Sequence, residues 1–313
     1  GSIDSPLSRE GAFLANNVLF AVFAFVVLLG TVFPLVVEAL QSRTIVVGEP
    51  FFDRLTIPIG ITMLTIMAIA PVLPWRKASQ ELLSKRLFWP AWCGVLALAG
   101  SVWVGATGLA PLLTFGLGGF AAGSALRQVV LATRRQGLRG LVGRANGGMI
   151  VHLGVIIIAV ALAASNSFTH SQELNLEAGK AASFSGHTFE LVDVVEVKTD
   201  NATAVKALVK IDGGKAYAPA ITKYVLQGMN VGTPSVKTGF AYDIYLTLDP
   251  PVRQDENKAR IKVFIKPLLL WLWIGGGLMA IGTVLAAFPG RRRRKPTSPT
   301  SEDDFAADLL VML

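Results

Sequence analysis

The chain has 313 residues, of which 52% are hydrophobic and only 16% are charged, and its mean hydropathy is +0.54. This composition excludes an ordinary water-soluble domain and is typical of a bundle of membrane helices. The formal net charge is +8. Because the basic residues gather beside apolar segments and do not interleave with aromatic residues, the charge indicates membrane topology and contact with anionic lipid, with no nucleic-acid partner.

Six apolar runs of about 20 residues are predicted to cross the membrane as helices. The first contains Asn16 and Asn17 and is too long for a signal peptide, so we expect it to be retained. The expected fold class is an α-helical polytopic membrane protein with a small β-rich extracytoplasmic domain inserted before the last helix. In chain order the runs lie at 12–37, 55–73, 87–110, 111–132, 147–167 and 267–288.

Three basic segments predict the orientation of the chain in the membrane. The connections 76–86 and 134–144 are rich in Lys and Arg, and a run of five basic residues occupies 291–295. Basic connections stay in the cytoplasm. We therefore expect both termini to be cytoplasmic, and the 38–54 connection and the long insert before the last helix to lie outside.

The insert, about 170–262, has eleven basic and eleven acidic residues and alternates apolar with polar positions. This alternation predicts strands, and several strands in about 95 residues suffice for a small sandwich or barrel. The strands are expected at 188–198, 204–211, 240–248 and 259–266. The resulting division is a five-helix membrane region at 1–168, a β-rich domain at 169–262, a final helix at 263–290 and a disordered cytoplasmic tail at 291–313.

Motifs of soluble enzymes are absent from the sequence, which has no Walker loop, nucleophile elbow, HExxH or acid pair placed for acid–base work. The single Cys93 has no activating His or acid nearby and is predicted to pack as a small hydrophobe. The glycine-rich stretches 116–123 and 275–277 lie inside apolar runs, where close packing between helices is the favoured interpretation over nucleotide binding.

His152 is the main candidate for a functional residue, because it lies near the start of the fifth apolar run. An ionisable side chain at that depth is costly, and a neutral imidazole is a strong axial ligand for haem iron. The alternative is a hydrogen bond to a neighbouring helix. The other two histidines, His170 and His187, lie in a polar stretch further along.

Further polar side chains are expected at a similar depth in the inner leaflet. Asn16 and Asn17 open the first helix, and Arg127 lies toward the end of the fourth, followed by the Arg pair at 134–135. Arginines there could bind haem propionates or a quinone headgroup. The alternative is that they extend to the lipid interface.

Four motifs carry a resemblance to a known family. They are SREGAFLANN at 8–17, GEPFFDR at 48–54, MIVHLG at 149–154 and WLWIGGGLMA at 271–280, with DIYLTL at 243–248 as a weaker fifth. In this order they resemble the C-terminal half of cytochrome c maturation protein F, CcmF, the haem lyase of a bacterial cytochrome c maturation system. Together the motifs are specific, whereas any one alone is weak.

The resemblance implies a multi-pass protein of the bacterial cytoplasmic (inner) membrane, and it also implies a function. Family members attach haem to the CxxCH thiols of apocytochrome c at the outer membrane face and take haem from the chaperone CcmE. His152 matches one of two membrane histidines that ligate an internal b-type haem, which is thought to pass electrons from quinol. The second ligand and the outer loop that presents haem belong to the N-terminal half of full-length family members. His187 receives no ligand role.

The implied partners are an N-terminal half of the same family, CcmE, apocytochrome c and thiol-handling maturation proteins, and the chain is expected to be inactive without that half. One alternative is a non-catalytic assembly subunit that docks partners without binding haem. Another is a small-solute transporter, for which the sequence offers no paired interrupted helices.

Overall fold

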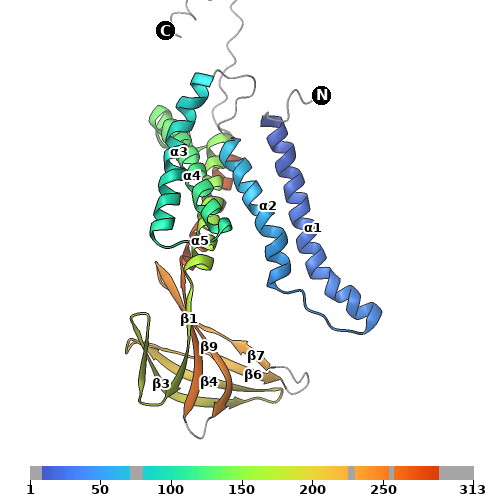
Figure 1. Ribbon diagram of the computed structural model, residues 1–313, viewed down its shortest axis with the longest axis vertical. Coiled ribbons are helices and arrows are strands. Elements are labelled where there is room, and N and C mark those ends of the chain that lie inside the picture. Colours follow the sequence, from blue (N-terminus) through green and yellow to red (C-terminus); the bar gives the residue numbers. More distant parts are fainter. Residues whose placement is uncertain (1–8, 71–79, 225–229, 254–256, 289–313) are drawn as a thin grey trace, which may run out of the picture.

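The structure is a computed structural model that describes residues 9–70, 80–224, 230–253 and 257–288. The described chain forms a helical bundle with a β domain at one end (Figure 1). The basic segment 291–295, the tail and part of the 76–86 connection lie outside the described residues. The helices are α1 (Arg9–Gln41), α2 (Glu49–Ile69), α3 (Gln80–Trp103), α4 (Leu109–Gln136), the short 3-10 helix η1 (Gly137–Leu141), α5 (Arg144–Phe168) and α6 (Leu269–Ala287).

Five of these helices are long and apolar enough to cross a membrane, namely α1, α2, α4, α5 and α6. Helical backbone is expected in such segments because lipid offers no hydrogen-bond partners to N–H and C=O groups. The apolar part of α3, Leu87–Trp103, has 17 residues and is shorter than the others. The multi-pass helical prediction is confirmed, and a sixth crossing stays a prediction.

Two helices begin or end at residues other than the predicted ones, because of nearby glycine or proline. The third helix was expected to reach 110 but ends at Trp103, because Gly105 and Gly108 adopt positive φ angles of 99° and 90°. The second was expected to begin at 55 but begins at Glu49, where Pro50 occupies the first turn and needs no backbone hydrogen bond there.

Small residues allow the helices of the bundle to approach closely. An alanine Cβ at Gly154 of α5 would lie 2.6 Å from the backbone oxygen of Gly275 in α6, and one at Gly119 of α4 would lie 2.7 Å from the backbone oxygen of Cys93 in α3. The glycines of the 116–123 stretch therefore pack closely against α3 at Cys93, and close packing between helices was the interpretation favoured for this stretch. In the 275–277 run only Gly275 packs in this way, since Gly276 and Gly277 have no heavy atom within 4 Å of a Cβ position.

The β domain consists of two antiparallel sheets. One has the strand order β1 (His170–Glu177), β10 (Lys258–Pro267), β9 (Tyr242–Arg253), β8 (Ser235–Lys237), and the other has the order β2 (Ala181–Phe184), β3 (His187–Lys198), β4 (Ala202–Ile211), β6 (Ala220–Tyr224), β7 (Asn230–Thr233), with β5 (Ala216–Tyr217) paired to β4. Alternate residues of the long strands are buried between the sheets, including Phe189, Leu191, Leu246, Ile261 and Val263. The four predicted strands are present.

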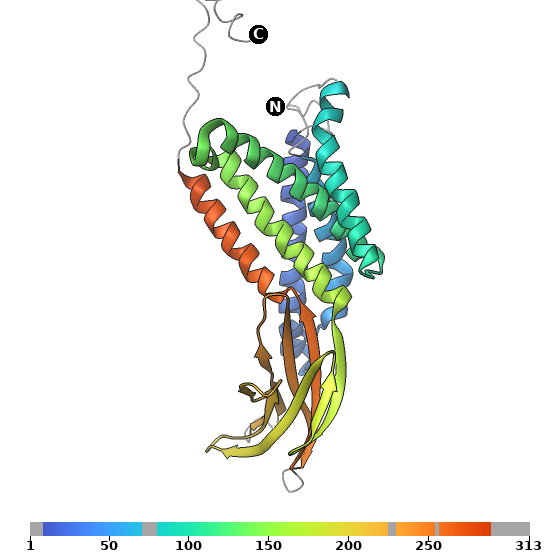
Figure 2. The ribbon, with the colours of Figure 1, turned by 90° about the vertical axis from the view of Figure 1, so that its left-hand side faces the viewer.

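Two membrane helices continue directly into two paired strands. Phe168 ends α5 two residues before β1 begins, and β10 ends two residues before α6 begins at Leu269. β1 and β10 pair with each other, as do α5 and α6 (Figure 2). The boundary expected between residues 262 and 263 therefore falls inside β10, because the strand pairing with β9 extends to Pro267. The β domain is thus held at the end of the bundle opposite the α4–α5 connection.

Candidate functional site

His152 lies on a partly open face of α5. Its side chain is partly buried and makes no hydrogen bond or ion pair with any described residue. Gly148 precedes it by one turn on the same face, and no heavy atom lies within 4 Å of a Cβ position there. The imidazole is therefore not held by a neighbouring helix within the described chain, and the helix surface beside it is free.

The other faces of α5 are covered. Gly154 lies against Gly275 and Met279 of α6, while Ile156 is buried in a cluster with Leu64 of α2 and residues of α4. The remaining face carries only partly buried or exposed side chains. Its members, spaced three or four residues apart, are Gly148, His152, Val155, Ala159, Leu162 and Asn166.

Arg127 is exposed and lies on a different side of α4 from α5. Gly118 of α4 faces Val160 of α5, whereas Gly123 faces Cys93 of α3. Arg127 follows Gly123 by four residues and so continues the α3-facing stripe. The described structure does not bring Arg127 next to His152.

Asn16 and Asn17 lie near the start of α1, Asn16 partly buried and Asn17 exposed. α1 packs on α2, which packs on α4 and stands between α1 and the α4–α5 layer (Figure 1). The two asparagines are therefore also apart from His152.

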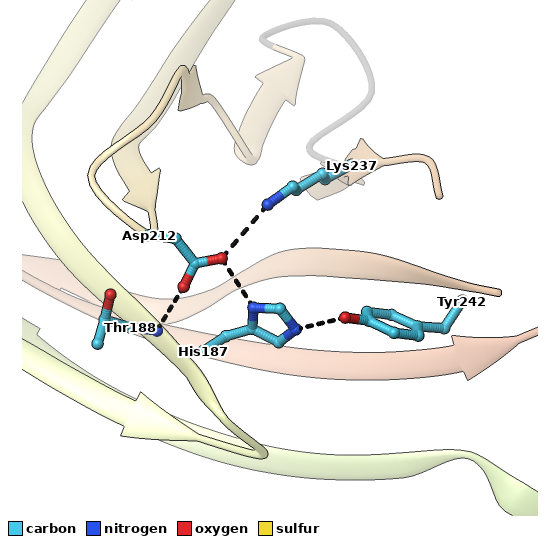
Figure 3. A network of polar contacts seen from close by, with 5 residues as sticks. All are labelled: His187, Thr188, Asp212, Lys237 and Tyr242. Carbon is cyan, nitrogen blue, oxygen red and sulfur yellow. Dashed lines mark hydrogen bonds and ion pairs between the residues drawn. The ribbon is translucent and has the colours of Figure 1, made fainter. Parts of the chain in front are cut away.

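A second group of polar side chains lies in the β domain, where the sequence offered no candidate. His187, at the start of β3, places Nδ1 2.8 Å from Oδ2 of Asp212 and Nε2 3.0 Å from the hydroxyl of Tyr242 (Figure 3). The Lys237 ammonium lies 3.4 Å from the same Asp212 oxygen. The His187 side chain is only 16% exposed. One imidazole thus links a carboxylate to a phenol.

Asp212 is ionised, and its carboxylate orients the His187 ring. Its Oδ1 accepts the Thr188 backbone N–H at 3.0 Å, and this bond, then the contact with His187, lowers the pKa of Asp212 from 3.8 to about 2. A carboxylate can only accept, so Nδ1 of His187 carries the proton that points at it. In a neutral imidazole with that tautomer, Nε2 accepts the hydrogen bond from the Tyr242 hydroxyl.

Part of this network could have been found from the sequence. Predicted strands at 188–198 and 204–211 form a hairpin, and the observed register Phe189↔Ile211 places Asp212 beside Thr188. Tyr242 is 55 residues from His187 and comes from the other sheet. No local pattern indicates that contact.

Comparisons with known proteins agree with the motifs. No protein-family model matches the chain. It is 30% identical over 305 residues to the cytochrome c-type biogenesis protein CcmF of Pseudomonas fluorescens, covering 94% of this chain and 46% of that protein. It is 33% identical to the cytochrome c-type biogenesis protein ccl1 of Rhodobacter capsulatus, covering 92% and 45%.

A solved structure titled cytochrome c heme lyase CcmF matches with a TM-score of 0.70 and 28% identity, covering 91% of this chain and 46% of that one. The chain spans about half the length of the curated relatives it matches. The resemblance inferred from the motifs is confirmed: over more than nine-tenths of its length the chain is similar in sequence and structure to about half the length of the CcmF cytochrome c biogenesis proteins.

Proposed function

We propose that the chain acts in cytochrome c biogenesis as part of a membrane haem lyase that joins haem to CxxCH segments of apocytochrome c. The observation that carries this proposal is the similarity to CcmF proteins over more than nine-tenths of the chain in both sequence and structure. Because the chain matches less than half of those proteins, the activity is proposed for a complex in which this chain is one part.

His152 is the proposed axial ligand of an internal b-type haem. A ligand for haem iron needs a neutral imidazole with a free ring nitrogen and room for a flat macrocycle beside it. His152 has no partner among the described residues, and the neighbouring Gly148 leaves the same face of α5 open. One-electron reduction and oxidation of iron is the chemistry that a haem supplies there, with quinol as the proposed electron donor.

The second axial ligand is proposed to come from another polypeptide or segment. The two other histidines of the chain, His170 and His187, both lie in the β domain, apart from the α5 face that carries His152. An N-terminal half of the same family would pack on the open face of α5 and bring its own imidazole. The roles of Asn16, Asn17 and Arg127 near the haem or a quinone stay predictions.

The proposed topology places the β domain outside the cytoplasm and both termini inside. Arg134 and Arg135 end α4 at the side of the bundle remote from the β domain, which agrees with the preference of basic residues for the cytoplasmic side. In this orientation the β domain would face CcmE, apocytochrome c and the thiol-handling maturation proteins.

The test is the reduced-minus-oxidised absorption spectrum of the chain, purified in detergent after co-expression with a candidate N-terminal half. Wild type is expected to give a b-type haem signal that His152→Ala abolishes. His170→Ala, in the β domain, is the matched control and should retain the signal. Co-purification of the two halves reports whether each variant still assembles.

Two results would count against the haem ligand. A signal that survives His152→Ala would mean that another residue holds the iron. Assembly of the complex without any haem would favour the alternative of a non-catalytic assembly subunit, in which the β domain docks partners.

A further inference from the structure

The connection between β8 and β9, residues 238–241, presents a large apolar side chain at the surface. Phe240 in this connection is 67% exposed. Its ring centroid lies 5.2 Å from that of Trp271, which is in the first turn of α6, and the Trp271 Nε1–H donates to the Phe240 carbonyl oxygen at 3.1 Å. An exposed phenylalanine is therefore held against the first turn of a membrane helix.

Two more hydrogen bonds fix this connection in place. The Leu268 N–H, one residue before α6, donates to the Ala241 carbonyl oxygen at 3.0 Å. At the other end, the carboxylate of the buried Asp243 accepts the Gly239 N–H at 3.1 Å. The fold therefore sets the position of Phe240 relative to α6, with the ring turned outward.

The length of α6 determines the depth of Phe240 in the membrane. α6 has 19 residues, so at a rise of 1.5 Å per residue it spans about 28 Å. The hydrocarbon core of a bilayer is about 30 Å thick, so both ends of α6 must lie at its boundaries. Trp271 thus lies at the depth where tryptophan is enriched, and Phe240 lies beside it. Phe168, at the end of α5, packs in one cluster with Leu268, so both helices reach the boundary at this level.

The side of the connection that faces the β domain is polar. The connection and Lys237 line a cavity of about 280 Å³ together with His187 and Tyr242. The Tyr242 hydroxyl donates to His187, and the Lys237 ammonium pairs with Asp212 at 3.4 Å. An apolar ring on one side and paired polar groups on the other suit a segment that lies between lipid and water. Because Lys237 is paired, we expect no preference for anionic lipid.

We propose that the 238–241 connection inserts Phe240 into the lipid leaflet beside the β domain, so that phospholipid acyl chains are the partner of this surface. The β domain is otherwise joined to the bundle through the two connections that lead from α5 to β1 and from β10 to α6. A third attachment, to the lipid itself, would restrain rotation of the domain about those two connections. The proposal depends neither on haem nor on which side of the membrane the β domain occupies.

The experiment measures the depth of position 240 with a spin label. The full chain is reconstituted into phosphatidylcholine nanodiscs after Cys93→Ala has removed its single cysteine, and Phe240→Cys is labelled with a nitroxide. Oxygen concentrates in lipid and a nickel chelate stays in water, so the expected result is frequent collision with oxygen and rare collision with nickel. Ala241→Cys, at a position that is also exposed, labels the same connection and replaces Phe240→Cys if that variant does not fold.

Val197→Cys is the matched control. Val197 is 39% exposed but lies ten residues further along β3 than His187, roughly 30 Å at about 3.3 Å per residue. Its label should collide more often with nickel than with oxygen. The proposal is overturned if the labels at positions 240 and 197 behave alike. It is also overturned if position 240 meets nickel in the chain alone and is protected only on co-expression with an N-terminal half, because the partner would then be a protein.

Discussion

Replacing Gly275 with alanine is expected to push α5 and α6 apart, whereas the same change at Gly276 is expected to be harmless. A Cβ at position 275 would lie 2.7 Å from Cγ1 of Ile158 and 2.8 Å from the carbonyl oxygen of Gly154. At position 276 no heavy atom lies within 4 Å. The backbone oxygen cannot move without the helix, so only the first substitution forces a shift.

The magnitude follows from comparing the two variants. Alanine is favoured over glycine in a helix by about 1 kcal/mol, and this gain is common to both changes. It cancels in the difference, which leaves the cost of overpacking, about 1–3 kcal/mol. Gly276→Ala should therefore be as stable as wild type or slightly more stable, and Gly275→Ala should be less stable than Gly276→Ala by that amount.

The assay is thermal unfolding of the detergent-purified chain, followed by the loss of the monodisperse species on size exclusion. Hydrogen exchange of α5 and α6 amides locates the effect. Equal stabilities of the two variants would refute the close packing of α6 on α5. A loss confined to Gly276→Ala would mean that the helix is rotated relative to the structure.

Three further outcomes test the β domain. Leu246→Ala, at a fully buried position, should lower the free energy of unfolding of the domain by about 2–5 kcal/mol. Val197→Ala, at a position 39% exposed, should lower it by less than about 0.5 kcal/mol. Urea titration with hydrogen exchange in β9 and β10 measures both losses, and equal losses would contradict the assigned core. Because the folded state lowers the pKa of Asp212 from 3.8 to about 2, its carboxylate stabilises the fold above about pH 4, and this contribution is lost as the pH falls toward 2. Asp212→Asn should therefore reduce the pH dependence of the melting temperature between about pH 4 and 2. A pH dependence equal to that of wild type would argue against the network. Trp271→Phe removes the hydrogen bond to the Phe240 carbonyl, which is worth about 0.5–1.5 kcal/mol. Hydrogen exchange at residues 239–242 should therefore become faster. Exchange as slow as in wild type would show that the bond does not hold this segment.

The amphipathic pattern of the insert explains why its strands were predictable. Ile261, Val263 and Ile265 are buried in β10 and alternate with less buried residues, most of them charged, as a strand with one buried face requires. The ends of the helices were less predictable, because hydropathy continues through residues 104–110 while Gly105 and Gly108 break the helix there. The sequence therefore predicted the elements better than their limits.

His152 could be singled out from the sequence because an imidazole in an apolar run is costly wherever its helix packs. Whether that imidazole is covered depends on the rotation of α5, which the glycine contacts with α4 and α6 determine. The same contacts place Arg127 on the α3 side, although its sequence position suggested proximity to His152. Depth along a helix can be counted from residues, whereas direction around it depends on the packing partners.

Local chemistry thus determined that the chain is a membrane protein with a β-rich insert, because burial of apolar runs and strand alternation depend only on neighbouring residues. Tertiary structure alone decided that His187, Asp212 and Tyr242 meet, since strands from two sheets must first pair in register. It also decided that the resulting cavity lies against the start of α6. The physical reason is that contacts between residues 25 and 55 positions apart arise from the packing of whole sheets, which no short pattern encodes.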